Sequence, residues 1–217
     1  MARLKLAVLV SGSGTNLQAL IDACKEPGFP AEIVQVVSNR PGVTALERAA
    51  GAGIPTDVIN HKAFTTRVAF DAAIHAVLEA SGADLVCLAG FMRLFTDGFV
   101  ERWRDRMINI HPSLLPAFPG RHTHKRALDA GVRFTGCTVH YVRPEMDTGP
   151  IIVQAALPVH PDDTVERLRE RVLSAEHRSY PLAVRLIAEG RVRVIDERAV
   201  IDDALVPGAA MLNPRER

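Results

Sequence analysis

The first half of the chain alternates short apolar segments with longer amphipathic ones. Apolar, β-branched runs predict five strands, over residues 4–10, 32–37, 54–59, 84–89 and 106–110. Between them, apolar residues at helical spacing predict helices over residues 15–26, 43–53, 66–80 and 97–103. This alternation is typical of βαβ units, which build a parallel sheet with helices on both faces. The pattern therefore predicts an α/β fold.

The sequence also predicts the cap of one helix, the buried face of another and one segment that cannot be helical. Ser13, Thr15 or Asn16 is available to cap the first helix. In the helix over residues 66–80, one side is expected to carry Val68, Ala72, His75 and Leu78. The segment HPSLLPAFPG that follows the fifth strand is too rich in proline to be helical.

The second half has a different rhythm. It predicts a short helix, two strands, a long helix interrupted near Pro181 and a last small hairpin, over residues 124–130, 135–142, 151–159, 165–189 and 191–201. The short loop RPEMDTGP between the two strands favours an antiparallel pair, so we expect a mostly parallel sheet with antiparallel strands at one edge. No repeat or linker divides the chain, which predicts a single domain over residues 1–217 with a loose tail over 209–217.

Composition and charge narrow the function classes. With 217 residues the chain can bury a large core without disulfides or metals, and its net charge of +1 provides no long-range field for nucleic acid. Its apolar runs are shorter than the roughly 18 to 20 residues of a membrane span. The three cysteines are odd in number and widely spaced, which fits buried thiols. We therefore expect a cytoplasmic protein that binds neither nucleic acid nor membranes.

The turn SGSGTN follows the first strand and opens the first helix. Its backbone N–H groups and the helix dipole favour a bound anion. The turn lacks the G-K-[ST] of a P-loop, and the second strand ends in Ser38-Asn39-Arg40 rather than in an acidic residue that would bind a dinucleotide ribose. A monophosphate ester fits best. The alternative is a glycine turn that only lets the helix pack against the sheet.

A polar pair stands at the end of the fifth strand. Strand alternation places Ile108 and Ile110 on one face, and Asn109 and His111 with Met107 on the other. The carboxyl end of the strand is the edge where α/β sheets bind ligands. An amide donor beside an imidazole suits acyl transfer, because both stabilise a developing oxyanion. The alternative is a pair of polar residues that only cap the strand.

Asp147 lies in the loop EMDTGP and would orient His111 if the two meet. The alternative is an aspartate that caps its own turn. His122 and His124, or Cys137 with His140, could in principle bind a metal, but no H-E-x-x-H helix or interleaved carboxylate supports it. We therefore predict no metal.

Taken together, the segments resemble a known family. SGSGTNLQALIDAC, SNRPG, LAGFMRLF, INIHPSLLPAFPG, HTHKRAL, GCTVHYV, MDTGPII and AEHRSYP are similar to the phosphoribosylglycinamide formyltransferases, in order, from about residue 4 to about residue 191. The resemblance implies the three-layer, Rossmann-like formyltransferase fold. It also implies that the formyl group of 10-formyltetrahydrofolate is transferred directly to the amine of glycinamide ribonucleotide in purine synthesis, by a monomer or a homodimer.

The resemblance also assigns roles by motif. Asn109 and His111 would polarise the formyl oxygen, with His111 as the proton donor, and Asp147 would hold His111 protonated and relay the proton of the amine. The glycinamide ribonucleotide would be bound by Gly14, Thr15, Asn16 and Glu176. The folate would be bound by Arg67, Met92, Arg93, Leu94, Phe95, Asn109, Val142 and Asp147, with the loop from Val142 to Asp147 closing over the pterin.

Departures and alternatives remain within this resemblance. Leu173 stands three residues before Glu176, where some relatives have a polar side chain, so the phosphate would depend more on the backbone turn. Arg121 precedes His122 in the proline-rich loop, and nothing is carried over beyond residue 191. Methionyl-tRNA formyltransferase and formyltetrahydrofolate hydrolase share the Asn, His and Asp set; each is expected to have an additional domain for which this length leaves no room. A ribonucleotide-binding module without catalysis is the alternative from another class.

Overall fold

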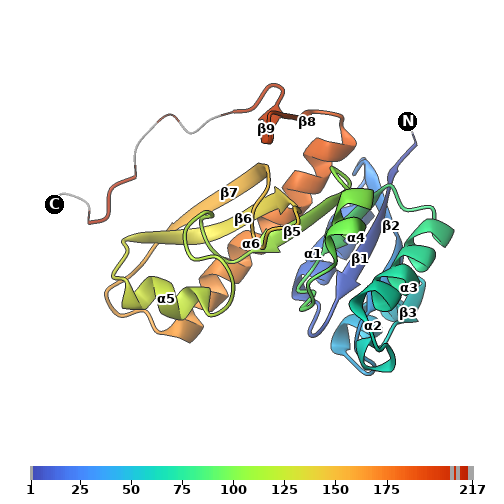
Figure 1. Ribbon diagram of the computed structural model, residues 1–217. Coiled ribbons are helices and arrows are strands. Elements are labelled where there is room, and N and C mark those ends of the chain that lie inside the picture. The colour runs from blue at the N-terminus through green and yellow to red at the C-terminus, as the bar shows by residue number, and fades with distance from the viewer. Residues whose placement is uncertain (1, 206–207, 209–210, 215–217) are drawn as a thin grey trace.

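A computed structural model describes residues 2–205, 208 and 211–214 (Figure 1). Its main sheet has seven strands in the order β3-β2-β1-β4-β5-β6-β7. Pairing is parallel from β3 to β5 and antiparallel from β5 to β7. The strands are β1 (Leu4–Val10), β2 (Ala31–Ser38), β3 (Thr56–Val58), β4 (Leu85–Leu88), β5 (Met107–His111), β6 (Phe134–Tyr141) and β7 (Ile151–Pro158). The predicted mixed sheet is confirmed.

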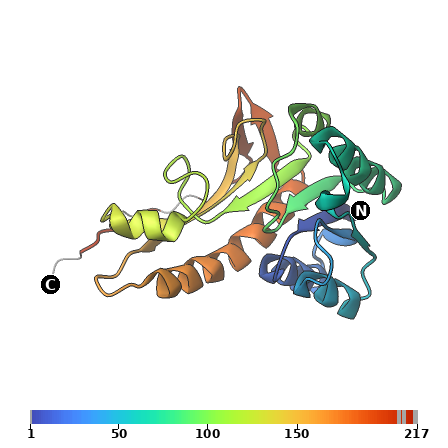
Figure 2. The same ribbon diagram turned by 60° about the horizontal axis from the view of Figure 1, so that its bottom comes forward.

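Helices cover both faces of this sheet. They are α1 (Thr15–Lys25), α2 (Thr44–Gly51), α3 (Arg67–Ala80), α4 (Asp97–Arg102), α5 (Thr123–Asp129) and α6 (Val165–Ala188), with a short 3-10 turn at His61–Ala63. One apolar cluster joins α1, α2 and α6 to the sheet, and a second cluster joins α3 and α4 to its other face. Figure 2 shows α6 running beneath the strands while α3 and α4 lie above them. The predicted three-layer α/β fold is confirmed.

Strand β5 contributes to both clusters by alternation. Ile108 and Ile110 belong to the cluster that joins α1 and α6 to the sheet. Met107 belongs to the cluster on the other face, with α3 and α4. The predicted alternation in this strand is therefore confirmed.

The helix α3 buries a different face from the one that the sequence predicted. Its buried apolar face carries Phe70, Ile74 and Leu78, whereas the side chain of Val68 is 67% exposed. The predicted face was right for Leu78 but wrong at Val68, because the Phe70 ring packs edge-on against Phe64 and stacks on Phe91, both in neighbouring loops. Burial of that large ring outweighs burial of a valine.

The long helix α6 is continuous through Pro181, so the predicted interruption was wrong. A proline in a helix loses one backbone hydrogen bond. Here the neighbouring residues Tyr180, Ala183 and Val184 are fully buried against the sheet, and the Tyr180 hydroxyl donates to the carbonyl of Leu88 at 3.0 Å. Tertiary packing on both sides of Pro181 thus keeps the helix intact.

The carboxyl-terminal segment folds back on the domain. The predicted hairpin is confirmed as β8 (Val192–Ile195) and β9 (Arg198–Ile201), which form a separate two-stranded sheet. Of the predicted loose tail, residues 209, 210 and 215–217 lie outside the described residues. Within the described part, the Asn213 amide donates to the carbonyls of Arg133 and Val159 at 2.7 and 3.0 Å, so residue 213 is held in place. None of the helices in the described part of the chain is both long and apolar enough to cross a membrane.

Two glycines give a direct test of this packing. A Cβ built on Gly136 of β6 would lie 1.8 Å from the carbonyl oxygen of Ala155 on β7, so Gly136→Ala forces the two strands apart. We expect this change to lower the free energy of unfolding by about 1 to 3 kcal/mol, the usual cost of overpacking.

The matched control is Gly98→Ala in α4, where a Cβ meets nothing within 4 Å. Because alanine is the better helix former, this variant should be more stable by up to about 1 kcal/mol. Urea unfolding of both variants measures the difference. Equal stability of the two variants would contradict the close pairing of β6 with β7.

Candidate active site

The polar pair at the end of β5 faces the antiparallel strand β6. Asn109 lies opposite His140, and His111 lies opposite Thr138. A bulge in the β6–β7 pairing falls at Val139 and His140. Bulges often occur beside active sites because they redirect a side chain. The register therefore brings the His140 ring to the Asn109 amide.

The His140 ring holds the Asn109 amide in one orientation. His140 Nδ1 lies 2.9 Å from the carbonyl of Tyr141 and 3.0 Å from that of Thr148, so Nδ1 carries the proton. Nε2 is then the acceptor for Asn109 Nδ2, at 3.3 Å. Burial lowers the pKa of His140, which keeps this ring neutral. The sequence did not indicate this role for His140, because the pairing depends on strand register.

The structure brings Asp147 and His111 together. Asp147 Oδ1 lies 3.4 Å from His111 Nδ1, and both side chains are nearly buried. Asp147 Oδ2 accepts a hydrogen bond from the backbone N–H of Gly120 at 2.6 Å. The carboxylate therefore joins the proline-rich loop to His111. The alternative of an aspartate that caps its own turn was wrong, since these partners lie outside its loop.

The other nitrogen of His111 is also engaged. Nε2 lies 3.1 Å from the carbonyl oxygen of Phe118, which also accepts from the Ser113 hydroxyl at 3.2 Å. Both ring nitrogens thus face oxygen acceptors, an arrangement that suits a ring with two N–H groups. A substrate oxygen that approaches His111 would have to replace one of these two contacts.

The predicted anion turn lies beside α6. Gly14 adopts a left-handed conformation with φ 69° as the residue that caps α1, and no side chain caps this helix. The predicted caps Ser13, Thr15 and Asn16 were therefore wrong, because Asn16 Nδ2 donates instead to Glu176 Oε2 at 2.7 Å. The glycine is also needed for packing, since a Cβ there would lie 2.6 Å from Ala45 Cβ.

Glu176 is a buried carboxylate, 7% exposed. Burial raises its pKa to about 7, while the hydrogen bond from Asn16 and the charge of Arg169 act in the opposite direction. Among the described residues, Asn16 Oδ1 is buried without a hydrogen-bond partner. The turn and α6 thus present one unpaired acceptor and one carboxylate that titrates near neutral pH.

The residues predicted to bind folate are spread over four segments: α3, the loop over residues 92–95, β5 with Asn109, and the loop after β6. Arg67 is exposed at the first position of α3, and Val142 follows β6 directly. Met92 and Leu94 are exposed, whereas the Phe95 ring stacks against Phe99 at 4.1 Å between ring centres. The Phe95 side chain therefore belongs to the core, which leaves its backbone for contact with a ligand.

A partly buried hydrogen bond connects this loop with the anion turn. The Ser11 hydroxyl accepts from the Met92 N–H at 2.8 Å and donates to Asn39 Oδ1 at 2.6 Å. Sequence reasoning missed Ser11 and Asn39, because neither position shows a distinctive spacing. Arg93, next to Met92, is half-buried in the same loop.

Outside the Asn109 and His111 pair, the described residues form a groove but no cluster that could hold a metal ion. In the described part of the chain, no three His, Cys, Asp or Glu side chains are placed to hold a metal ion together. A groove of about 730 Å³ between α1 and α6 is lined by Thr15, Arg48, His177 and neighbouring residues, but not by Asn109 or His111. The groove is therefore separate from the Asn109 and His111 pair.

Comparison with known proteins places this geometry in a family. A family model described as formyl transferase matches residues 4–184. The phosphoribosylglycinamide formyltransferase of Haemophilus influenzae is 41% identical over 209 residues, 96% of this chain and 99% of that protein. A crystal structure of glycinamide ribonucleotide transformylase 1 from Symbiobacterium toebii superposes with a TM-score of 0.90 and 50% identity, covering 93% of this chain and 95% of that one.

Longer relatives contain the same segment. The trifunctional purine biosynthetic protein adenosine-3 of Gallus gallus is 55% identical over 192 residues, and this similarity covers 88% of the chain but only 19% of that protein. The chain thus matches about a fifth of the trifunctional relatives and nearly the whole of the Haemophilus influenzae protein. On the family model and these full-length matches, the chain belongs to the formyl transferase family.

Proposed function

We propose that this chain transfers the formyl group of 10-formyltetrahydrofolate to the amine of glycinamide ribonucleotide, giving N-formylglycinamide ribonucleotide and tetrahydrofolate. The observation that carries the proposal is the convergence of Asn109, His111 and Asp147 at the carboxyl end of β5, with Asp147 3.4 Å from His111. The names of the full-length relatives support formyl transfer to phosphoribosylglycinamide. The folate is a substrate in this proposal and no metal takes part.

The amide and the imidazole act on the formyl oxygen. The amine of the ribonucleotide attacks the formyl carbon, a C–N bond forms, and the carbonyl electrons move to oxygen. Asn109 has a second N–H beyond the one given to His140, and we assign it to this oxygen. His111 gives the oxygen a proton by exchanging one of its present acceptors. One such donor contributes roughly 3 to 4 kcal/mol of transition-state stabilisation.

The carboxylate completes the proton balance. Asp147 is held by Gly120 and His111, and it receives the proton that the amine loses, through a water molecule. When the intermediate collapses, the hydroxyl proton returns to His111 and the carbonyl re-forms. The C–N10 bond breaks, and the tetrahydrofolate nitrogen takes up the proton held by Asp147, through the same water molecule. Orientation of two bound reactants adds roughly 7 to 11 kcal/mol, so no covalent intermediate is required.

The anion turn and Glu176 provide the second half of the site. We assign the phosphate of the ribonucleotide to the backbone of Gly14, Thr15 and Asn16, and its ribose and glycinamide end to Glu176. The bond from Asn16 to Glu176 links these two contacts. The loops with Met92 to Phe95 and Val142 to Asp147 would bind the folate, with Arg67 near its glutamate tail.

The activity can be tested with purified protein, glycinamide ribonucleotide and 10-formyltetrahydrofolate, by following folate absorbance with and without a chelator. We expect a rate that requires both substrates and does not change with chelator. A rate with folate alone would favour a hydrolase, and no rate with both substrates present would contradict the proposal.

Replacement of the catalytic side chains should separate chemistry from folding. His111→Ala or Asp147→Asn should lower kcat by about 100-fold or more, because each removes a group that moves a proton or orients its donor. Thermal unfolding should change little. His160→Ala, at an exposed histidine outside the site, is the control and should keep wild-type turnover. Wild-type turnover in either site variant would contradict the assigned roles.

Replacement of Glu176 should raise the stability of the protein and weaken the binding of its substrate. The pKa of Glu176 is about 7 in the folded protein and 4.5 in the unfolded chain. Its ionised form therefore lowers the free energy of unfolding. This destabilisation is absent below pH 4.5 and complete above pH 7. Glu176→Gln should therefore raise the free energy of unfolding at pH 8 by up to roughly 3 kcal/mol, and leave it unchanged near pH 4.

Binding should respond in the other direction. For wild type, KM for glycinamide ribonucleotide should rise roughly tenfold for each pH unit below 7, since the ionised form binds the substrate. In Glu176→Gln the KM should be higher and lack this dependence on Glu176 ionisation. Glu189→Gln, at a half-exposed carboxylate, is the control. A Gln variant that loses stability at pH 8 would show that Glu176 is a structural residue.

A further inference from the structure

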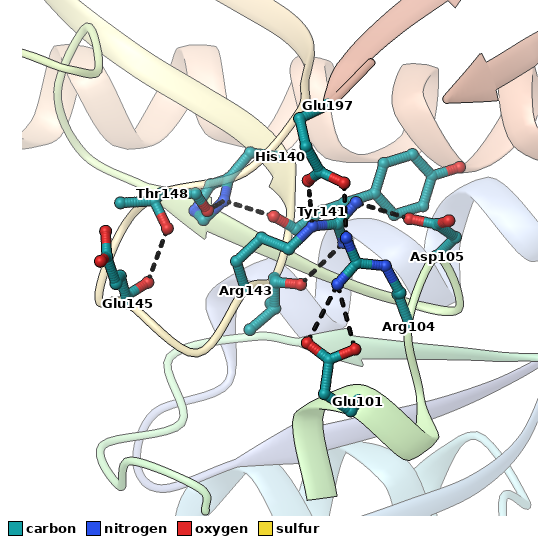
Figure 3. Close-up of polar contacts among 10 residues, drawn as sticks. Glu101, Arg104, Asp105, His140, Tyr141, Arg143, Glu145, Thr148 and Glu197 are labelled. Carbon is teal, nitrogen blue, oxygen red and sulfur yellow. Dashed lines mark hydrogen bonds and ion pairs between the residues drawn. The ribbon is translucent and has the colours of Figure 1, made fainter. Parts of the chain in front are cut away.

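A buried guanidinium stands at the root of the loop that carries Asp147. Arg143, whose side chain is 7% exposed, follows β6 and Val142. Its Nε donates to Glu197 Oε2 at 2.5 Å, Nη2 donates to Asp105 Oδ1 at 2.7 Å, and Nη1 donates to the Val142 carbonyl at 3.1 Å (Figure 3). Three of its nitrogens are therefore fixed from three directions.

The two ends of this loop meet at the stem of Arg143. A Cβ on Gly149 would lie 2.2 Å from the Tyr141 carbonyl oxygen and 3.0 Å from Arg143 Cγ. The chain leaves β6 and returns to β7 across this contact, with Asp147 between. A shift of the Arg143 side chain would thus be transmitted to the loop that carries Asp147.

Glu197, which accepts from Arg143, has a backbone conformation that is unfavourable for residues other than glycine. It lies with Asp196 in the two-residue turn between β8 and β9, and Asp196 and Glu197 both have positive φ, 48° and 57° respectively. Such turns favour Asn or Asp followed by Gly, because glycine adopts this conformation without strain. A glutamate persists there only if its surroundings hold it.

The side chain of Glu197 supplies that support. Besides Arg143, its carboxylate pairs with Arg104 at 2.5 Å, and Arg104 pairs with Glu101 at 3.0 Å. The hydrogen bond from Arg143, followed by the charges of both arginines, lowers the pKa of Glu197. Acidic and basic side chains therefore alternate from Glu101 in α4, through Arg104 and Glu197, to Arg143 at the start of the loop (Figure 3).

We propose that the β8–β9 hairpin braces the loop that carries Asp147, and that Glu197 is a positioning residue that acts through Arg143. This proposal rests on the proposed function, because the braced loop is the one assigned to folate and proton transfer. Without Glu197, the Nε–H of a buried guanidinium loses its acceptor, and only Asp105 and the Val142 carbonyl still hold the guanidinium. The loop ends would then lose their fixed spacing.

A glycine variant separates positioning from stability. Glu197→Gly relieves the strained turn but also removes the carboxylate that pairs with Arg143 and Arg104, so a purely structural residue would change stability and leave the kinetics unchanged. The brace instead predicts a fall of about 10-fold in kcat/KM for 10-formyltetrahydrofolate under conditions where the variant is fully folded, the scale expected when a catalytic group is slightly misplaced. KM for glycinamide ribonucleotide should not change.

Two further variants and a second measurement complete the test. Glu197→Gln keeps the length of the side chain, the strained backbone and one acceptor oxygen for Arg143 Nε but loses the charge, so it should show a smaller kinetic fall than Glu197→Gly. Asp196→Asn changes the other turn residue to a favoured type and should be kinetically silent. Amide hydrogen exchange over residues 142–149 should be faster in Glu197→Gly than in wild type.

The outcomes are decisive in each direction. Wild-type kcat/KM and exchange in Glu197→Gly would overturn the brace. A wild-type protein without formyl transfer would overturn the proposed function, and the exchange measurement alone would then test the brace. An effect confined to KM for glycinamide ribonucleotide would also overturn it, since that substrate is assigned to the opposite side of β5.

Discussion

In the candidate site, the placement of Asn109, His111 and Asp147 depends on the register of two antiparallel strands. The pairing of β5 with β6 sets Asn109 opposite His140, and the loop that leaves β6 returns Asp147 to His111. A slip of one residue would turn Asn109 and His111 into the apolar face now filled by Ile108 and Ile110. Burial of those isoleucines on one face is thus what presents the amide and the imidazole on the other. Core packing and site geometry here have one cause.

Around this pair, the protein accepts local costs that a stable core alone would not require. Glu176 is buried with a raised pKa, and Asp147 and Glu197 have left-handed backbone conformations. Each cost lies beside the proposed chemistry: at the ribonucleotide, at the proton relay and at the brace of the relay loop. Functional sites are where such strain and desolvation are expected to gather. The rest of the sheet, by contrast, follows ordinary packing rules.

Periodicity was sufficient for the order of elements and for the site strand, because local alternation decides both. The alternation of Ile108 and Ile110 with Asn109 was enough to predict a polar edge at this strand. Periodicity failed where tertiary contacts override local preference, as at Pro181, which burial of its neighbours keeps helical. It also failed where partners are distant in sequence. Neither the contact of Asp147 with Gly120 nor the pairing of Arg143 with Glu197, 54 residues away, leaves a local pattern.

We propose that Asn109 and His111 both hydrogen-bond to one carbonyl oxygen, beside a turn that we propose binds the sugar phosphate. The most direct measurement is a crystal structure of the protein with an analogue that joins a glycinamide ribonucleotide to a folate through a tetrahedral carbon. We predict that the oxygen on that carbon lies within hydrogen-bond distance of Asn109 Nδ2 and a ring nitrogen of His111, with the phosphate at Gly14 to Asn16. An analogue bound in the α1–α6 groove, or with its oxygen away from both side chains, would contradict this claim.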